Sequence, residues 1–109
     1  MNEHATQADL NAALDRLWQQ FLPQIEERID VLEAAGEALA AGILNNDHRE
    51  AAHVAAHKLA GVLGTFGLTK GTVLAREAEI LCSADADAAS AVELTDIAGQ
   101  LRQIVSARA

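Results

Sequence analysis

The residues best suited to chemistry lie in one short segment, residues 53–67, which reads HVAAHKLAGVLGTFG. The segment combines His53, His57 and Lys58 with glycines inside what the apolar spacing predicts to be a helix. An imidazole in water is largely neutral at neutral pH, and its free nitrogen lone pair can act as a nucleophile. No serine nucleophile motif accompanies it. The segment therefore predicts a lone histidine that reacts with a group brought by a partner.

A helical wheel at about 100° per residue separates this segment into two faces. Leu59 and Phe66 mark the buried face, and His57 lies about 160–220° away from them, on the side facing solvent. Gly61 and Gly64 lie about 40° and about 20° from His57. A glycine inside a helix costs about 1 kcal/mol relative to alanine. Bare backbone beside His57 therefore indicates a surface that a partner approaches closely.

The same residues leave two other interpretations open. His53 and His57 are four residues apart on one helix face, a spacing that suits two metal ligands, with Glu50 or His48 as further ligands. Alternatively, the glycines serve close helix packing in a structural or dimerising bundle. Apart from these alternatives, His4, His48 and His53 are interpreted as ordinary solvated histidines.

Composition places this segment in a small acidic protein with one core. The chain has 109 residues, of which 50% are hydrophobic and only 3% aromatic, as suits packed helices built from Leu, Ile, Val and Ala. Its net charge of −8 disfavours nucleic acid and anionic membranes, because both attract a basic surface. Cys82 lies at a core spacing and predicts a buried, reduced thiol. Without a signal sequence or an apolar run of ~20 residues, we expect a cytoplasmic protein.

Apolar spacing divides the first part of the chain into two predicted helices. The first is short and covers one end or side of the fold, and Pro23 ends it with a kink or break. The second is long and runs from about residue 24 to about residue 42. The apolar stripe of the first helix consists of Leu10, Leu14, Leu17 and Phe21.

Three more helices are predicted in the second part of the chain. One begins near Asp47, which forms a capping-box pattern with Glu50, and ends near Phe66 with Gly67 as its stop. The next covers residues 69–82, and a polar turn follows over residues 83–87. Ser90 and Glu93 are spaced as a capping box for the last helix. Short connections favour antiparallel neighbours. We therefore expect one all-α domain over residues 1–109, an antiparallel up-down four-helix bundle with an additional short N-terminal helix.

The segment AHKLAGVLGTFGLTKGTVLAREAE resembles the signature helix pair of histidine-containing phosphotransfer (HPt) domains, which are helical bundles with an exposed, phosphorylatable histidine. The similarity covers about residues 53–79, and the other helices agree in architecture. Residues 74–79, LAREAE, are similar to a run on the family's next helix. The residues that match the family pattern on the histidine helix are His57, Leu59, Gly61, Phe66 and Gly67.

The resemblance implies a phosphorelay. His57 would accept a phosphoryl group from the aspartate of a response-regulator receiver domain and pass it to another receiver aspartate. Such receivers occur within hybrid histidine kinases and multidomain response regulators. The Mg²⁺ would belong to the receiver, and this chain would carry no cofactor. No nucleotide-binding motif is present, so we expect a phosphocarrier rather than an autonomous ATP-dependent kinase.

The chain departs from the family pattern at one position. Many members carry a lysine three residues after the histidine, where this chain has Ala60. Lys58 lies about 100° around the helix from His57 and is expected to reach the phosphoryl group. Lys70 is a second cation considered for the same face. Both lysines could equally be ordinary solvated side chains, which is the preferred interpretation of Lys70. The expected partner-docking surface consists of His53, Ala60, Gly61 and Gly64, with Ala60 exposed.

Overall fold

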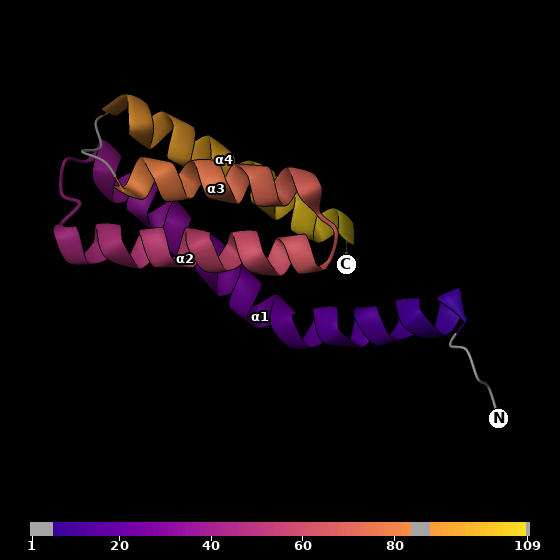
Figure 1. Cartoon of the computed structure of the whole chain (residues 1–109). Helices are drawn as coiled ribbons and strands as arrows, with labels where there is room; N and C mark the ends of the chain where they lie inside the picture. Colours follow the sequence, from indigo (N-terminus) through magenta and orange to yellow (C-terminus); the bar gives the residue numbers. More distant parts are fainter. Residues whose placement is uncertain (1–5, 84–87, 109) are drawn as a thin grey trace.

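The structure, a computed structural model, describes residues 6–83 and 88–108. Within these residues the chain is all-helical, as predicted. Figure 1 shows α2, α3, α4 and the C-terminal part of α1 packed side by side, while the N-terminal part of α1 projects beyond them. No helix among the described residues is long and apolar enough to cross a membrane. The helices are α1 (Gln7–Ala40), α2 (Asn46–Thr65), α3 (Thr69–Ser83) and α4 (Ala88–Arg108).

α1 continues as one helix through Pro23, so a break and a separate short N-terminal helix are wrong, whereas the alternative of a kink agrees with the change of direction along α1 in Figure 1. A proline inside a helix costs about 3 kcal/mol because it removes one hydrogen bond. Pro23 and Gln19 are exposed, so water can donate to the carbonyl that loses its helical partner. Trp18 and Ile25, on either side of Pro23, are both fully buried. A continuous helix keeps both on one face, and burying two large side chains offsets the cost of the proline.

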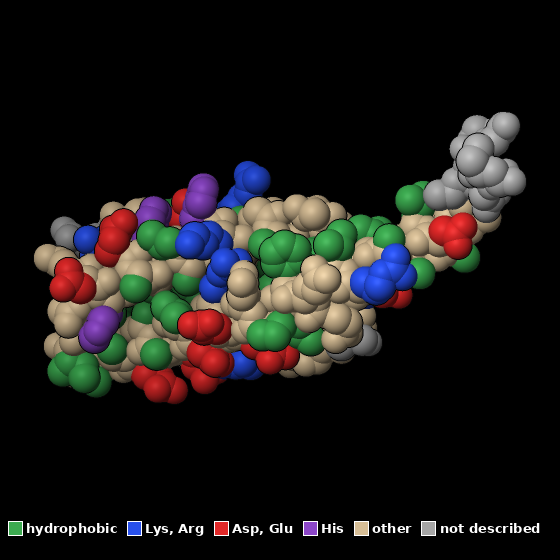
Figure 2. Space-filling model, turned by 90° about the horizontal axis from the view of Figure 1, so that it is seen from below, with side chains coloured by type: hydrophobic (Ala, Val, Ile, Leu, Met, Phe, Trp, Pro, Cys, Tyr) green, Lys and Arg blue, Asp and Glu red, His purple; other side chains and the backbone are tan. Residues whose placement is uncertain are grey.

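The apolar stripe at the start of α1 is largely exposed, and within the described part of the chain its last residue, Phe21, contacts the ring of Phe66. Leu10, Leu14, Leu17 and Phe21 are 49%, 39%, 43% and 37% exposed. Figure 2 shows hydrophobic side chains running from the body of the molecule onto the projecting arm. This part of α1 therefore extends away from the bundle instead of covering one end or side of it.

The end of α2 confirms the predicted glycine stop. Gly67 adopts φ +73°, a left-handed conformation that side chains disfavour. The amide of Gly67 donates to the carbonyl of Gly64 at 3.0 Å, and the amide of Leu68 donates to the carbonyl of Leu63 at 2.9 Å. This pair of hydrogen bonds is the Schellman arrangement, and it turns the chain tightly from α2 into α3.

Two predicted helix starts differ from the structure. Asn45, and not Asp47, caps α2: its side-chain oxygen accepts a hydrogen bond from the amide of His48 at 2.8 Å. Asp47 therefore lies inside the first turn, where its charge favours the positive end of the helix. Ser90 lies inside α4, which begins at Ala88, and so does not cap that helix. Most of the turn predicted over residues 83–87 falls outside the described residues.

Cys82 is 3% exposed and unpaired, as predicted for a core thiol. Burial raises the pKa of the Cys82 thiol to about 11, and the nearby charge of Arg49 only partly opposes this. Because the thiolate is the reactive form, the folded chain keeps this cysteine inert near neutral pH.

Trp18 joins α1 to the ends of α2 and α4. Its indole is fully buried and meets the ring of Phe66 edge-on, with ring centroids 5.2 Å apart. The guanidinium of Arg108 lies 5.2 Å from the centroid of the Trp18 ring on another side, and Arg108 also pairs with Asp15 at 3.0 Å. The projecting arm is thus fixed to the bundle at Trp18.

We predict that Trp18→Ala lowers the free energy of unfolding by about 3–5 kcal/mol, the cost of emptying a large core position. Urea denaturation followed by far-UV circular dichroism measures this loss. Phe21→Ala is the matched control. The ring of Phe21 also packs edge-on against Phe66, with ring centroids 6.2 Å apart, but Phe21 is 37% exposed. An equal loss in the two variants would contradict the role given to Trp18.

Candidate functional site

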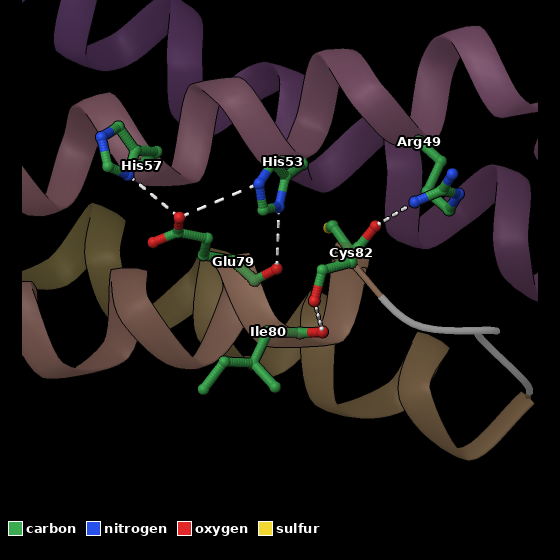
Figure 3. A network of polar contacts seen from close by, with 7 residues as sticks. Arg49, His53, His57, Glu79, Ile80 and Cys82 are labelled. Carbon is green, nitrogen blue, oxygen red and sulfur yellow. Dashed lines mark hydrogen bonds and ion pairs between the residues drawn. The ribbon is translucent and has the colours of Figure 1, made fainter.

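The site centres on His57, near the middle of α2, whose side chain is 73% exposed. Its Nδ1 atom lies 2.9 Å from Oε2 of Glu79, which reaches across from α3. Figure 3 shows the other ring nitrogen pointing away from Glu79. A carboxylate can only accept hydrogen bonds, so the neutral imidazole carries its proton on Nδ1. The lone pair is then on Nε2, the nitrogen that faces away.

His53 lies one turn earlier on α2 and contacts the same residue of α3. Its Nδ1 atom is 3.1 Å from the backbone carbonyl of Glu79, to which it donates, and its Nε2 atom is 3.9 Å from Oε2 of Glu79. The side chain is only 29% exposed, because it lies between the two helices. His53 is therefore not an ordinary solvated histidine. It helps to hold α3 in register with α2 beside His57 (Figure 3).

A third contact continues this line of polar interactions toward the end of α3. Nη1 of Arg49 donates to the backbone carbonyl of Cys82 at 2.7 Å. Because the last carbonyls of a helix lack intrahelical partners, this hydrogen bond satisfies one of them. Arg49, His53 and His57 thus face α3 from successive turns of α2, and the two helices are fixed where the site lies.

The two glycines near His57 have different surroundings. A Cβ atom built on Gly61 would meet no atom within 4 Å, so open space lies over this backbone. A Cβ atom on Gly64 would lie 3.4 Å from the hydroxyl oxygen of Thr72, so this glycine borders α3. The docking surface expected from the sequence is therefore open at Gly61, whereas Gly64 also serves the contact between α2 and α3.

Ala60 does not lie on an exposed face as expected. It is 6% exposed and belongs to the core cluster, and its carbonyl accepts a hydrogen bond from the Thr72 hydroxyl at 3.4 Å. The wheel places Ala60 about 60° from His57 on the side where α3 packs, so α3 covers it. Ala60 is therefore largely covered by α3 and is not part of an exposed face.

The two lysines expected near the phosphoryl group do not face Glu79. Lys58 is exposed and lies about 160° from Ala60 around α2, on the side away from α3. Lys70 lies nine residues before Glu79 on α3, which places it about 13 Å from the site along the helix axis. The structure therefore does not bring Lys70 to His57.

Two residues of the site, Glu79 and Arg76, were missed by the sequence reasoning. Together with His57, Ala60 and Gly61 they line a surface hollow of about 320 Å³ between α2 and α3. The sequence contained a relevant pattern, because Arg76 and Glu79 are three residues apart and two charged side chains at that spacing share one face of α3. What the sequence did not show was which face of α3 lies beside His57.

A metal site finds no support in the described part of the chain. No group of three or more His, Cys, Asp or Glu side chains there is arranged to hold a metal ion. Glu50 and His48, the further ligands considered, do not join His53 and His57, whose hydrogen bonds go to Glu79.

Comparison with known families identifies the family of the chain. A family model described as the Hpt domain matches residues 16–108. The match covers nearly the whole chain, and the chain therefore belongs to the Hpt domain family. No curated protein and no solved structure gives a significant match. Members of this family act in phosphorelays and interact with response-regulator receiver domains.

The hydrogen bond between His57 and Glu79 predicts the tautomer of the free domain. We expect the ¹⁵N NMR signals of the His57 ring to show a protonated Nδ1 in the wild type at pH values where the ring is neutral. In Glu79→Ala the acceptor is gone, and the proton should redistribute toward Nε2. Glu79→Gln is the control, because its amide oxygen can still accept from Nδ1. Identical ring spectra in wild type and Glu79→Ala would contradict the assignment.

Proposed function

We propose that this chain is a phosphorelay intermediate in which His57 carries the phosphoryl group between two receiver aspartates. The observation that carries the proposal is the state of the His57 ring: Nδ1 is occupied by Glu79 at 2.9 Å, and Nε2 is free on an exposed side chain. The chain would act as one unit over residues 1–109, with its four helices in antiparallel up-down order. Its action would take place in the cytoplasm.

The transfer would proceed by in-line displacement at phosphorus. The Nε2 lone pair of His57 forms the N–P bond while the P–O bond to the receiver aspartate breaks, and that electron pair leaves on the aspartate carboxylate. The ring becomes an imidazolium that still carries its Nδ1 proton, and the Glu79 carboxylate beside it balances the new positive charge. The receiver supplies the Mg²⁺ that screens the phosphoryl oxygens.

The same hydrogen bond would assist the second transfer. When an aspartate of the next receiver attacks phosphorus, the N–P bond breaks and its electron pair returns to Nε2. Because Nδ1 keeps its proton throughout, the leaving group is neutral imidazole and not the far more basic imidazolate. Glu79 is thus proposed as a positioning residue that serves both directions without proton exchange.

The partner would dock over the open backbone at Gly61, beside His57. Gly61 offers no side chain and no neighbouring atom within 4 Å of a Cβ position, so a receiver can bring its aspartate close to Nε2. His53 and Gly64 border this surface toward α3. In this arrangement most of the phosphoryl-transfer machinery belongs to the partner, which agrees with the few polar residues around His57.

The acceptor assignment predicts a clear separation of two histidine variants. His57→Gln should abolish acceptance of label from a phosphorylated receiver, while the melting temperature stays near that of the wild type because the side chain is 73% exposed. His53→Gln should still accept label. The label should be acid-labile and base-stable, as phosphohistidine is. Acceptance by His57→Gln, or its loss in His53→Gln alone, would contradict the assignment.

If a receiver docks over Gly61, a large side chain at position 61 should block phosphorylation by a receiver domain but not by a small-molecule phosphoryl donor. Gly61→Leu should fold with unchanged or higher stability, because its side chain enters open space and leucine favours a helix. Its phosphorylation by a receiver should fall steeply, while phosphorylation by phosphoramidate should persist. Gly61→Ala is the matched control, expected to gain about 0.5–1 kcal/mol of stability with a smaller effect on transfer.

A destabilised Gly61→Leu domain would instead show that this glycine serves packing. An equal loss of activity with receiver and phosphoramidate would show that the leucine disturbs His57 itself. Either result would contradict docking at this position.

A further inference from the structure

The hollow beside His57 contains a positive charge that the transfer mechanism described above does not use. Arg76 of α3 lines this hollow together with His57, Ala60, Gly61 and Glu79. It is exposed and lies one helical turn before Glu79 on the same face of α3. A phosphoryl group on Nε2 of His57 would therefore be added at the edge of a hollow whose wall includes a guanidinium.

Arg76 differs from most other arginines of the chain because it is not tied to another described residue. Arg102 binds both Asp30 and Glu33, Arg108 pairs with Asp15, and Arg49 donates to the carbonyl of Cys82. Within residues 6–83 and 88–108, the side chain of Arg76 makes neither a hydrogen bond nor an ion pair. Its donors remain available for an incoming group.

The charge of the phosphorylated site favours such a cation, above all once the receiver and its Mg²⁺ have left. The chain has a net charge of −8, and the phosphoryl group would add negative charge close to the carboxylate of Glu79. A guanidinium presents several N–H donors in a planar fork that matches two phosphoryl oxygens at once. Lys58 is placed less well, because it leaves α2 about 100° from His57 on the side away from the hollow.

We propose that Arg76 binds the phosphoryl group carried by His57, donating from its guanidinium to the oxygens on phosphorus. Arg76 reaches the group from α3, the helix that also supplies Glu79. The two residues have different roles: Glu79 sets the protonation of the ring, and Arg76 neutralises the negative charge of the phosphoryl group. This inference rests on His57 being the phosphoryl acceptor, as argued above.

The test uses phosphoramidate as the donor, so that it does not depend on an identified receiver. Phosphorylation of His57 is followed by ³¹P NMR in wild type, Arg76→Ala, Arg76→Lys and Lys58→Ala, with His57→Gln to identify the signal. We expect Arg76→Ala to lower the phosphorylation rate about three- to tenfold, the effect of one exposed charge-assisted contact. Arg76→Lys should retain part of the rate, and Lys58→Ala should stay near wild type.

Two further measurements separate binding of the group from a structural role. On phosphorylation, the Nε–H signal of Arg76 should shift in the wild type and stay in place in His57→Gln. The ¹⁵N signals of the unphosphorylated His57 ring should be unchanged in Arg76→Ala, whereas loss of support for Glu79 would move them. The melting temperature of Arg76→Ala should match the wild type, because the side chain is exposed.

Several results would overturn the inference. The first is a phosphorylation rate in Arg76→Ala equal to that of the wild type. The second is a loss of rate in Lys58→Ala as large as that in Arg76→Ala. The third is an Arg76 Nε–H signal that does not shift on phosphorylation. If phosphorylated receivers label the wild type while Arg76→Ala behaves identically, the role of Arg76 fails and the relay function stands. If the Arg76 effects hold with phosphoramidate but no receiver labels the chain, the relay function fails instead. A ³¹P signal that survives in His57→Gln would overturn both.

Discussion

The close approach of α2 and α3 is the constraint on which the site depends. The axes of packed helices lie about 8–10 Å apart, and small side chains at the contact allow the closer distances. Small residues line the contact between α2 and α3. A Cβ atom on Gly71 would lie 3.0 Å from Leu63, and the short side chain of Thr72 reaches the backbone carbonyl of Ala60. At this separation the carboxylate of Glu79 reaches His57. Even an added Cβ atom at Gly71 would press on the side chain of Leu63, so this glycine permits the close approach of α3 to α2.

The distribution of charge over this acidic protein fits the proposed phosphoryl carriage at His57. Away from the site, Arg102 and Arg108 are joined to carboxylates of α1 and hold α4 against that helix. Hydrogen bonds to Asp30 and Glu33 raise the pKa of Arg102 above its usual range. Near His57 the single carboxylate in contact is paired with the ring instead of with a cation. The guanidinium of Arg76 is thus left available for the phosphoryl group that we propose His57 carries.

The sequence could predict the helical segments and the exposure of His57, because periodicity reports which face of a helix is buried. It also placed the stop at Gly67, where a left-handed residue is needed. A break at Pro23 was predicted from the low helix preference of proline. That preference is outweighed by the burial of Trp18 and Ile25 on one continuous helix face. The sequence missed Glu79, since a partner 22 residues away depends on the register between two helices, which no single helical wheel contains.

The helical glycines show most clearly what the sequence alone could not decide, namely which neighbour approaches the backbone at each of them. A glycine within a helix indicates only that something approaches the backbone, and that neighbour can belong to the same chain or to a partner. A Cβ atom on Gly36 would lie 2.6 Å from the Thr95 hydroxyl, so that glycine serves the contact between α1 and α4. Gly61 faces open space beside His57, whose Nε2 atom makes no contact with Glu79. No neighbour within the described residues explains the missing side chain at Gly61, and this open backbone supports the proposed docking of a receiver beside His57.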